Sequence, residues 1–129
     1  MSKEAVRTER APAPFQGAPY SQAIKANGFV FVSGQHALVP GAHELVPGGI
    51  AEQTEQVLTN LRAILEAAGT SLDNLVRTTV FLQDLADFGG MNEVYARHVG
   101  PTPPSRSTIE VAKLPSGALV EIDAIAVLS

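Results

Sequence analysis

Alternating apolar and polar positions are the most prominent pattern in the chain, and they predict strands in its second half. Residues 75–83 (Leu-Val-Arg-Thr-Thr-Val-Phe-Leu-Gln) alternate in this way and are rich in β-branched side chains, which favour extended structure. Two further runs of this kind, at about 106–111 and 119–127, close the chain. We therefore expect three strands in this half.

A tight turn is predicted near the start of the chain. Asn27-Gly28 readily supplies the positive φ angles of a type I′ turn, and it separates two short apolar runs at residues 21–26 and 29–33. This pattern predicts a β-hairpin.

Two segments have the periodicity of amphipathic helices. The clearer one covers residues 52–68, follows a glycine- and proline-rich loop at 40–49, and ends before Gly69. The weaker one covers about 87–99 and is stopped by Gly100-Pro101. The apolar positions are Val57, Leu58, Leu61, Ile64, Leu65 and Ala68 in the first helix, and Phe88, Met91, Tyr95 and Val99 in the second.

The resulting order of elements, β-β-α-β-α-β-β, predicts an α+β fold in which two helices cover one face of a mixed sheet. The last strand is apolar on both sides, and a strand of this kind is buried on both faces. Its two sets of apolar positions are Val120, Ile122, Ala124 and Ala126 on one side and Ile125 and Val127 on the other. Because the helices cover only one face, we expect copies of the same chain to cover the second.

The first 13 residues are expected to form a loose lead-in, because the prolines of Ala11-Pro12-Ala13-Pro14 disfavour a helix. Residues 14–129 then form a single domain, in keeping with the length of 129 residues. The start of the chain has neither the apolar core of a secretion signal nor the composition of a transit peptide. A cytoplasmic location is the default expectation.

Composition narrows the classes of function. The net charge of −4 and the nine scattered Lys and Arg residues argue against binding nucleic acid through its phosphates. No apolar run is long enough to cross a bilayer, so no membrane partner is expected. The chain has no cysteine, which excludes thiolate nucleophiles and cysteine-based metal sites.

Arg106 opens one of the two final strands and Glu121 lies inside the next. If these strands are neighbours, the two side chains can meet across the sheet or across an interface. A guanidinium binds a carboxylate through two parallel hydrogen bonds, and a partly buried glutamate is suited to act as a general base. The same two residues can also form a structural ion pair, and their types alone do not decide between the two interpretations.

Several motifs in a fixed order give the chain a family resemblance. They are residues 18–23 (Ala-Pro-Tyr-Ser-Gln-Ala), 32–35 (Val-Ser-Gly-Gln), 78–82 (Thr-Thr-Val-Phe-Leu) with Asp84-Leu85, 104–107 (Pro-Ser-Arg-Ser) and 120–122 (Val-Glu-Ile). From about residue 14 to residue 129, the chain resembles the RidA (YjgF) family of reactive-intermediate deaminases, formerly described as endoribonuclease L-PSP.

The resemblance implies a chorismate-mutase-like fold, a homotrimer and a site in the cleft between subunits. It also implies hydrolysis of 2-imino acids, such as 2-iminobutanoate and 2-iminopropanoate, and of their enamine tautomers to 2-oxo acids and ammonia, without a cofactor. Such imines are products of pyridoxal-phosphate-dependent dehydratases. In this chemistry Arg106 binds the substrate carboxylate, while Glu121 takes a proton from water and delivers one to the departing nitrogen.

Five further residues are expected to contact the substrate. The resemblance places Tyr20 and Asn92 at the cleft, although Tyr20 also fits a core aromatic residue and Asn92 an exposed helical one. Gly34, preceded by Ser33, either lets the backbone approach a ligand closely or simply ends a strand. Thr108 departs from the family pattern and is expected to shape the pocket wall.

The three histidines, His36, His43 and His98, have unlike contexts and no metal-ligand spacing, so they are interpreted as surface or loop residues. Ala18 and the pair His36-Ala37 also depart from the family pattern, with expected effects on substrate preference. The chain has neither a phosphate-binding loop nor a dinucleotide-binding motif. No metal or other cofactor is expected.

Two other functions fit parts of the pattern. A non-enzymatic module that senses a small carboxylate metabolite needs Arg106 but not Glu121. An endoribonuclease or translation inhibitor, a role also ascribed to the family, needs affinity for RNA, which the acidic composition disfavours.

Overall fold

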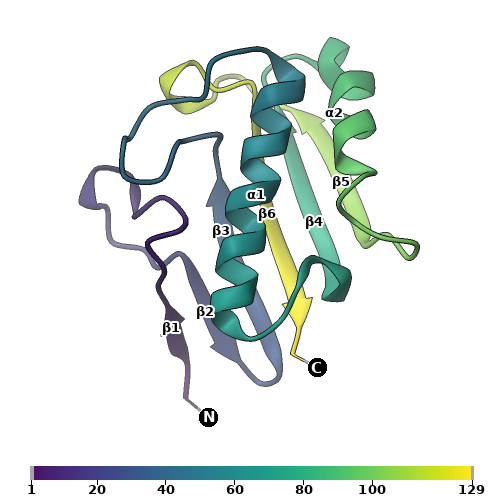
Figure 1. Ribbon diagram of the computed structural model, residues 1–129. Coiled ribbons are helices and arrows are strands. Elements are labelled where there is room, and N and C mark those ends of the chain that lie inside the picture. Colours follow the sequence, from purple (N-terminus) through teal and green to yellow (C-terminus); the bar gives the residue numbers. More distant parts are fainter. Residues whose placement is uncertain (1, 129) are drawn as a thin grey trace.

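In the computed structural model, which describes residues 2–128, a six-stranded sheet carries two helices on one face (Figure 1). The strands are β1 (Glu4–Val6), β2 (Ala23–Ala26), β3 (Phe29–Gln35), β4 (Leu75–Leu82), β5 (Ser105–Glu110) and β6 (Val120–Val127). The helices are α1 (Ile50–Ala68) and α2 (Phe88–Tyr95), and short 3-10 turns lie at η1 (Phe15–Gly17), η2 (Leu72–Asn74), η3 (Leu85–Asp87) and η4 (Pro115–Gly117). The predicted α+β class with a mixed sheet is confirmed.

The strands lie in the order β1-β2-β3-β6-β4-β5, so the last strand inserts into the middle of the sheet. Only β4 and β5 are parallel, and the other neighbouring pairs are antiparallel. The predicted hairpin is confirmed, with φ angles of 53° at Asn27 and 82° at Gly28. The expectation that Arg106 and Glu121 lie on neighbouring strands is wrong, because β4 separates β5 from β6.

Helix α1 packs its apolar stripe on the sheet, and Leu58, Leu61 and Leu65 are completely buried. In its first turn, Glu52 accepts a hydrogen bond from the backbone N–H of Gly49 at 2.8 Å, which holds the pKa of Glu52 below its ordinary value. The helix ends at Gly69, whose φ of 93° lies in the left-handed region. It begins two residues earlier than the apolar pattern predicts and ends as predicted.

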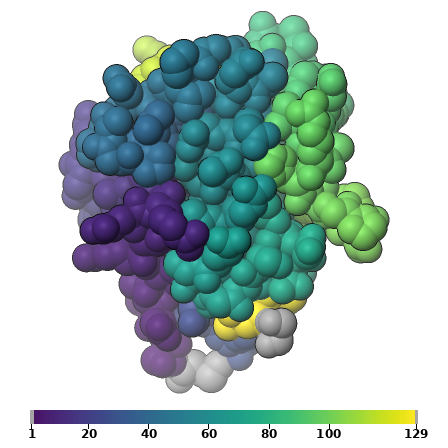
Figure 2. Space-filling model, viewed as in Figure 1, coloured from purple at the N-terminus to yellow at the C-terminus, as the bar shows by residue number. Residues whose placement is uncertain are grey.

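Helix α2 ends at Tyr95, before the predicted end at about residue 99. The N–H groups of Arg97 and His98 donate to carbonyls three residues earlier, each at 3.0 Å, so the chain tightens into 3-10-like turns. The Tyr95 hydroxyl is 2.7 Å from Thr78 Oγ1 on β4, a buried hydrogen bond that fastens α2 to the sheet. The green segment after α2 projects from the body of the molecule (Figure 2).

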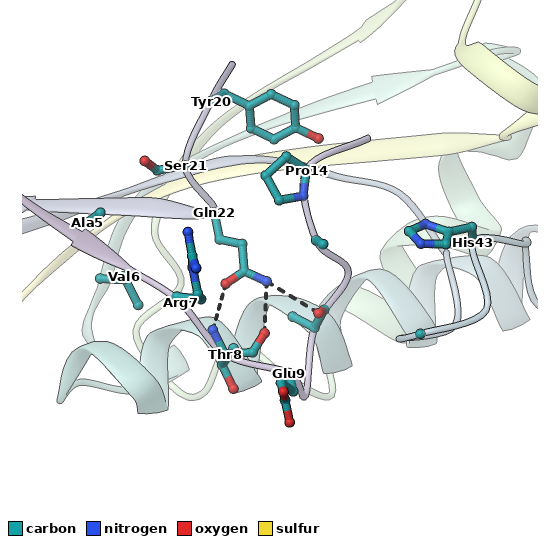
Figure 3. Close-up of a pocket in the computed structure, with 13 residues that line it drawn as sticks. Ala5, Val6, Arg7, Thr8, Glu9, Pro14, Tyr20, Ser21, Gln22 and His43 are labelled. Carbon is teal, nitrogen blue, oxygen red and sulfur yellow. Dashed lines mark hydrogen bonds between the residues drawn. The ribbon is translucent and has the colours of Figure 1, made fainter. Parts of the chain in front are cut away.

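The loose lead-in expected over residues 1–13 is ordered in its described part from residue 4 to residue 12. β1 adds an edge strand to the sheet through β2, and both Val6 and Ala11 are buried. The buried amide of Gln22 accepts a hydrogen bond from Thr8 N–H at 2.8 Å and donates to the Thr8 and Ala11 carbonyls (Figure 3), and it also donates to the Pro12 carbonyl. The Gln22 side chain, directly before β2, therefore ties residues 8–12 to the sheet.

The sheet face opposite the helices exposes apolar side chains. The residues of β6 alternate between buried and half-buried, as expected for a strand that is apolar on both sides. The side chains on this open apolar face are Phe29, Phe31, Phe81, Ile109, Ile125 and Val127. A patch of this kind marks an interaction surface. Among residues 2–128, no helix is both long and apolar enough to cross a membrane.

Candidate functional site

A bulge in β3 lies next to Glu121. Between Val32 and Gln35 the pairing of β3 with β6 shifts, which places the irregularity at Ser33-Gly34. Bulges re-aim side chains and are frequent beside active sites. Here the bulge brings the end of β3 against the Glu121 side chain.

The carboxylate of Glu121 is held between two neighbours. Its Oε1 lies 2.8 Å from His36 Nε2, and its Oε2 lies over the Cα of Gly34, in the space that a Cβ would occupy. The side chains of His36 and Glu121 are 17% and 24% exposed, so the pair is largely enclosed but reachable from solvent. Gly34 is thus a point of close approach, and the group that approaches it is the glutamate.

Gly34→Ala is therefore expected to displace the Glu121 carboxylate and break its hydrogen bond to His36. The cost in stability should be about 1 kcal/mol or less, because the displaced group is the end of a flexible side chain. A crystal structure of the variant gives the distance from Glu121 Oε1 to His36 Nε2, and urea denaturation gives the stability. Gly89→Ala in α2 is the matched control, since a Cβ there meets no atom within 4 Å. An unchanged distance in the Gly34 variant would contradict the argument.

Tyr20 lies beside the bulge that holds Glu121, and Ser33 is part of that bulge. The Tyr20 side chain is 42% exposed and its hydroxyl accepts a hydrogen bond from Phe15 N–H at 2.6 Å, so the alternative of a core aromatic is wrong. Tyr20, Gly34 and His36 line one small hollow. The Ser33 hydroxyl donates to the Ser21 carbonyl at 2.7 Å, which fixes its position. We call Tyr20, Ser33, Gly34, His36 and Glu121 the glutamate cluster.

Arg106 lies in a second cluster, under α2. Its guanidinium carbon is 5.5 Å from the centre of the Phe88 ring and 4.9 Å from that of the Tyr95 ring. Cation–π contacts of this kind hold a guanidinium in place without neutralising it. Within residues 2–128, Arg106 forms no salt bridge. The cation is therefore positioned and available to an anion.

Asn92 and Thr108 belong to the same cluster. Asn92 lies four residues after Phe88 and three before Tyr95, so these three side chains share one side of α2. Thr108 lies two residues beyond Arg106, so both are on the same face of β5. Asn92 Oδ1 and Thr108 Oγ1 are both buried without a hydrogen-bond partner in the described part of the chain, so Asn92 is not an exposed helical residue. We call Phe88, Asn92, Tyr95, Arg106 and Thr108 the arginine cluster.

The two clusters lie on opposite faces of the sheet. On β4, Thr78 pairs with Arg106 and Phe81 pairs with Glu121. Thr78 faces α2 through its bond to Tyr95, and Phe81, three positions further along, faces the other way. Arg106 and Glu121 therefore do not form an ion pair within one chain, and the partner of Glu121 is His36.

All three histidines lie outside the helices and strands, as the loop interpretation expects, but two of them contact acidic side chains. His36 contacts Glu121, as described above. The side chain of His98 is only 8% exposed and lies 2.9 Å from Glu55 Oε1 and 2.8 Å from the Arg62 guanidinium. Only His43 is exposed. The sequence did contain one indication for His36, because this residue directly follows the strand that carries Ser33-Gly34. That position turns the imidazole ring toward the same site.

A larger groove, of about 540 Å³, runs along the N-terminal segment and includes Arg7, Glu9 and His43 (Figure 3). Tyr20 lies at its border with the glutamate cluster, but neither Glu121 nor Arg106 lines it. In residues 2–128, no three His, Cys, Asp or Glu side chains converge as metal ligands. Arg106 presents a positioned cation to an anionic group, and Glu121 presents a carboxylate that solvent can reach.

Comparison with known proteins places the chain in a family. Residues 8–128 match the family described as endoribonuclease L-PSP. A RutC family protein of Pyrococcus horikoshii is 52% identical, over 96% of this chain and 97% of its own length. A mouse protein named 2-iminobutanoate/2-iminopropanoate deaminase is 45% identical, over 97% of this chain and 91% of its own.

Solved structures agree with this placement. The crystal structure of E. coli TdcF with bound serine is 39% identical, with a TM-score of 0.90, and the match covers 98% of this chain and 99% of that one. The match over residues 8–128 and the identities over nearly the whole length show that the chain belongs to the RidA (YjgF) family, also described as endoribonuclease L-PSP.

Proposed function

We propose that this protein hydrolyses 2-imino acids and their enamine tautomers to 2-oxo acids and ammonia, at a site made by two copies of the chain. The observation that carries the proposal is the guanidinium of Arg106, which two aromatic rings hold in place without a carboxylate partner in residues 2–128. A planar cation in this setting suits the carboxylate of a small amino-acid-like substrate. Relatives named imine deaminases, and one solved with bound serine, support this substrate class.

The reaction needs one group that moves protons, and Glu121 is the candidate. The carboxylate takes a proton from a water molecule as the water oxygen bonds to the imine carbon, and it passes that proton to the nitrogen. A second transfer, from the new hydroxyl to the nitrogen, breaks the C–N bond and releases ammonia as the C=O bond forms. Both transfers run from oxygen to nitrogen, so one carboxylate serves both steps and ends unchanged.

The placement of the clusters supports a site between copies. The glutamate cluster and the arginine cluster lie on opposite faces of one sheet, so the glutamate cluster of one chain has to meet the arginine cluster of another. A contact between two unlike surfaces closes into a ring when the rotation between neighbouring copies closes, and otherwise forms an open filament. We propose a ring of three, as the family resemblance implies, in which the open apolar face is covered by neighbouring copies.

The test is an assay in which an amino-acid oxidase generates 2-imino acids in the presence of semicarbazide, which traps the imine. The wild-type protein should lower the amount of semicarbazone by removing the imine first. Unchanged trapping across a panel of small imino acids would refute the deaminase. The acidic protein should also show no RNA affinity that weakens steeply with salt.

A module that only senses a small carboxylate is the remaining alternative, because Arg106 alone suffices for it. Calorimetric titration with 2-oxobutanoate as the probe separates the two functions. In an enzyme, Glu121→Gln should retain binding and lose turnover. In a sensor, the wild type itself should bind the probe without turning over any imine.

A further inference from the structure

His36 is placed against Glu121 by a rigid part of the fold. Its backbone carbonyl accepts a hydrogen bond from Asn60 Nδ2 at 3.1 Å, and the same amide donates to the Leu38 carbonyl at 3.0 Å. Asn60 is completely buried in α1. The segment just after β3 is therefore fastened to the central helix, and the imidazole projects from a fixed backbone.

The direction of the hydrogen bond follows from the chemistry of the two groups. An ionised carboxylate only accepts hydrogen bonds, so Nε2 of His36 carries the hydrogen and donates it to Glu121 Oε1 at 2.8 Å. One carboxylate oxygen is thereby occupied. Oε2 lies over Gly34, which lines a small hollow together with Tyr20, and it makes no side-chain hydrogen bond within residues 2–128.

We infer that His36 is a positioning residue that fixes the Glu121 carboxylate and leaves Oε2 as the oxygen that takes the proton from water. This inference rests on the proposed function and deepens it. Gly34 sets how close the carboxylate lies to the backbone, and His36 sets its rotation. Misplacing a reacting group by about 1 Å is enough to cost roughly a hundredfold in rate.

A purely structural role explains the pair less well. Both side chains remain partly exposed, and pairs in contact with solvent contribute little to stability. The carboxylate could reach solvent by itself if it only needed solvation. The hydrogen bond instead fixes its direction, which matters for a group that acts on a substrate.

Three variants test the inference with the oxidase and semicarbazide assay. His36→Leu, which cannot donate, should lower kcat by about tenfold to a hundredfold. Its KM should change little, because Arg106 binds the substrate carboxylate. His36→Gln should recover most of the loss, since its side-chain amide can donate to Oε1. His43→Leu, at the exposed histidine, is the matched control and should retain wild-type kinetics.

Turnover in the wild type with an unchanged kcat in His36→Leu would overturn the role of His36 and leave the deaminase intact. Equal losses in His36→Leu and His36→Gln with a raised KM would also overturn it, since they indicate a pocket wall. Absence of turnover in the wild type refutes the proposed function, and the catalytic role of His36 with it.

Nitrogen-15 NMR of the imidazole checks the pair without any substrate. We expect a protonated Nε2 in the wild type and a changed Nε2 resonance in Glu121→Ala. An unchanged resonance would overturn the hydrogen bond on which the inference stands.

Discussion

Replacing Arg106 with alanine is expected to lower kcat/KM for 2-imino acids by roughly a hundredfold to a thousandfold. Truncating a charged group that pairs with a ligand in a desolvated site costs about 2–5 kcal/mol, which corresponds to losses of this size. Arg106→Lys should lose most of the same activity, because an ammonium keeps the charge but cannot make the two parallel hydrogen bonds. The measurement is the rate of 2-oxo acid release as a function of substrate concentration.

The fold should survive this change. The contacts of Arg106 with Phe88 and Tyr95 are worth about 0.5–1 kcal/mol each at a partly exposed site, far less than the stability of a domain. Circular dichroism and light scattering should therefore match those of the wild type. Arg97→Ala is the matched control, since Arg97 is exposed in the turn after α2 and, within residues 2–128, forms a salt bridge only with Glu93. Unfolding or dissociation of the Arg106 variant would instead assign the arginine a structural role.

The sequence predicted the elements whose causes are local. The helix that ends at Gly69 and the hairpin at Asn27-Gly28 follow from apolar spacing and from residues that tolerate positive φ. The strand β1 was missed because three residues with one buried side chain show no readable alternation. Its attachment depends on Gln22, which acts across 10 to 14 positions of sequence.

Sequence reasoning chose candidate site residues one by one, but it did not place them in the sheet. Arg106 and Glu121 were chosen for their chemistry, and sequence proximity suggested adjacent strands. The order of strands in a sheet is set by long-range packing, and here β6 lies between β3 and β4. That order separates Arg106 from Glu121, and the register of both strands with β4 puts them on opposite faces. Of the two arrangements that the sequence left open, across the sheet or across an interface, the first is excluded.

His36 shows a different limit of sequence reasoning. A histidine without metal-ligand spacing was interpreted as a surface or loop residue without a role in the site, because spacing along the chain was the criterion. Its partner Glu121 lies 85 positions away, and the contact depends on the antiparallel pairing of β3 with β6. Such a partner becomes visible only when the register of the sheet is known.

Mixing two inactive variants is expected to restore activity, if each site takes one cluster from each of two chains. Arg106→Ala keeps an intact glutamate cluster, and Glu121→Gln keeps an intact arginine cluster. Alone, Arg106→Ala no longer binds the substrate carboxylate, and Glu121→Gln lacks the general base. Loss of the base costs about 10²–10⁴-fold in rate. In rings assembled at random from equal amounts, about one contact in four joins the two intact clusters, so about a quarter of the wild-type activity should return.

The experiment is to unfold the two variants together in guanidinium, refold them, and compare the rate with the same variants refolded separately. Native mass spectrometry of chains with different tags confirms that mixed rings have formed. The control mixes the wild type with the double variant in equal amounts. Half of the contacts of each wild-type chain are then with inactive chains, so the activity should be half of that of the same wild-type chains alone. Mixed rings that remain inactive would show that the whole site lies within one chain. The position of the two clusters on opposite faces of the sheet would then no longer support assembly into a ring.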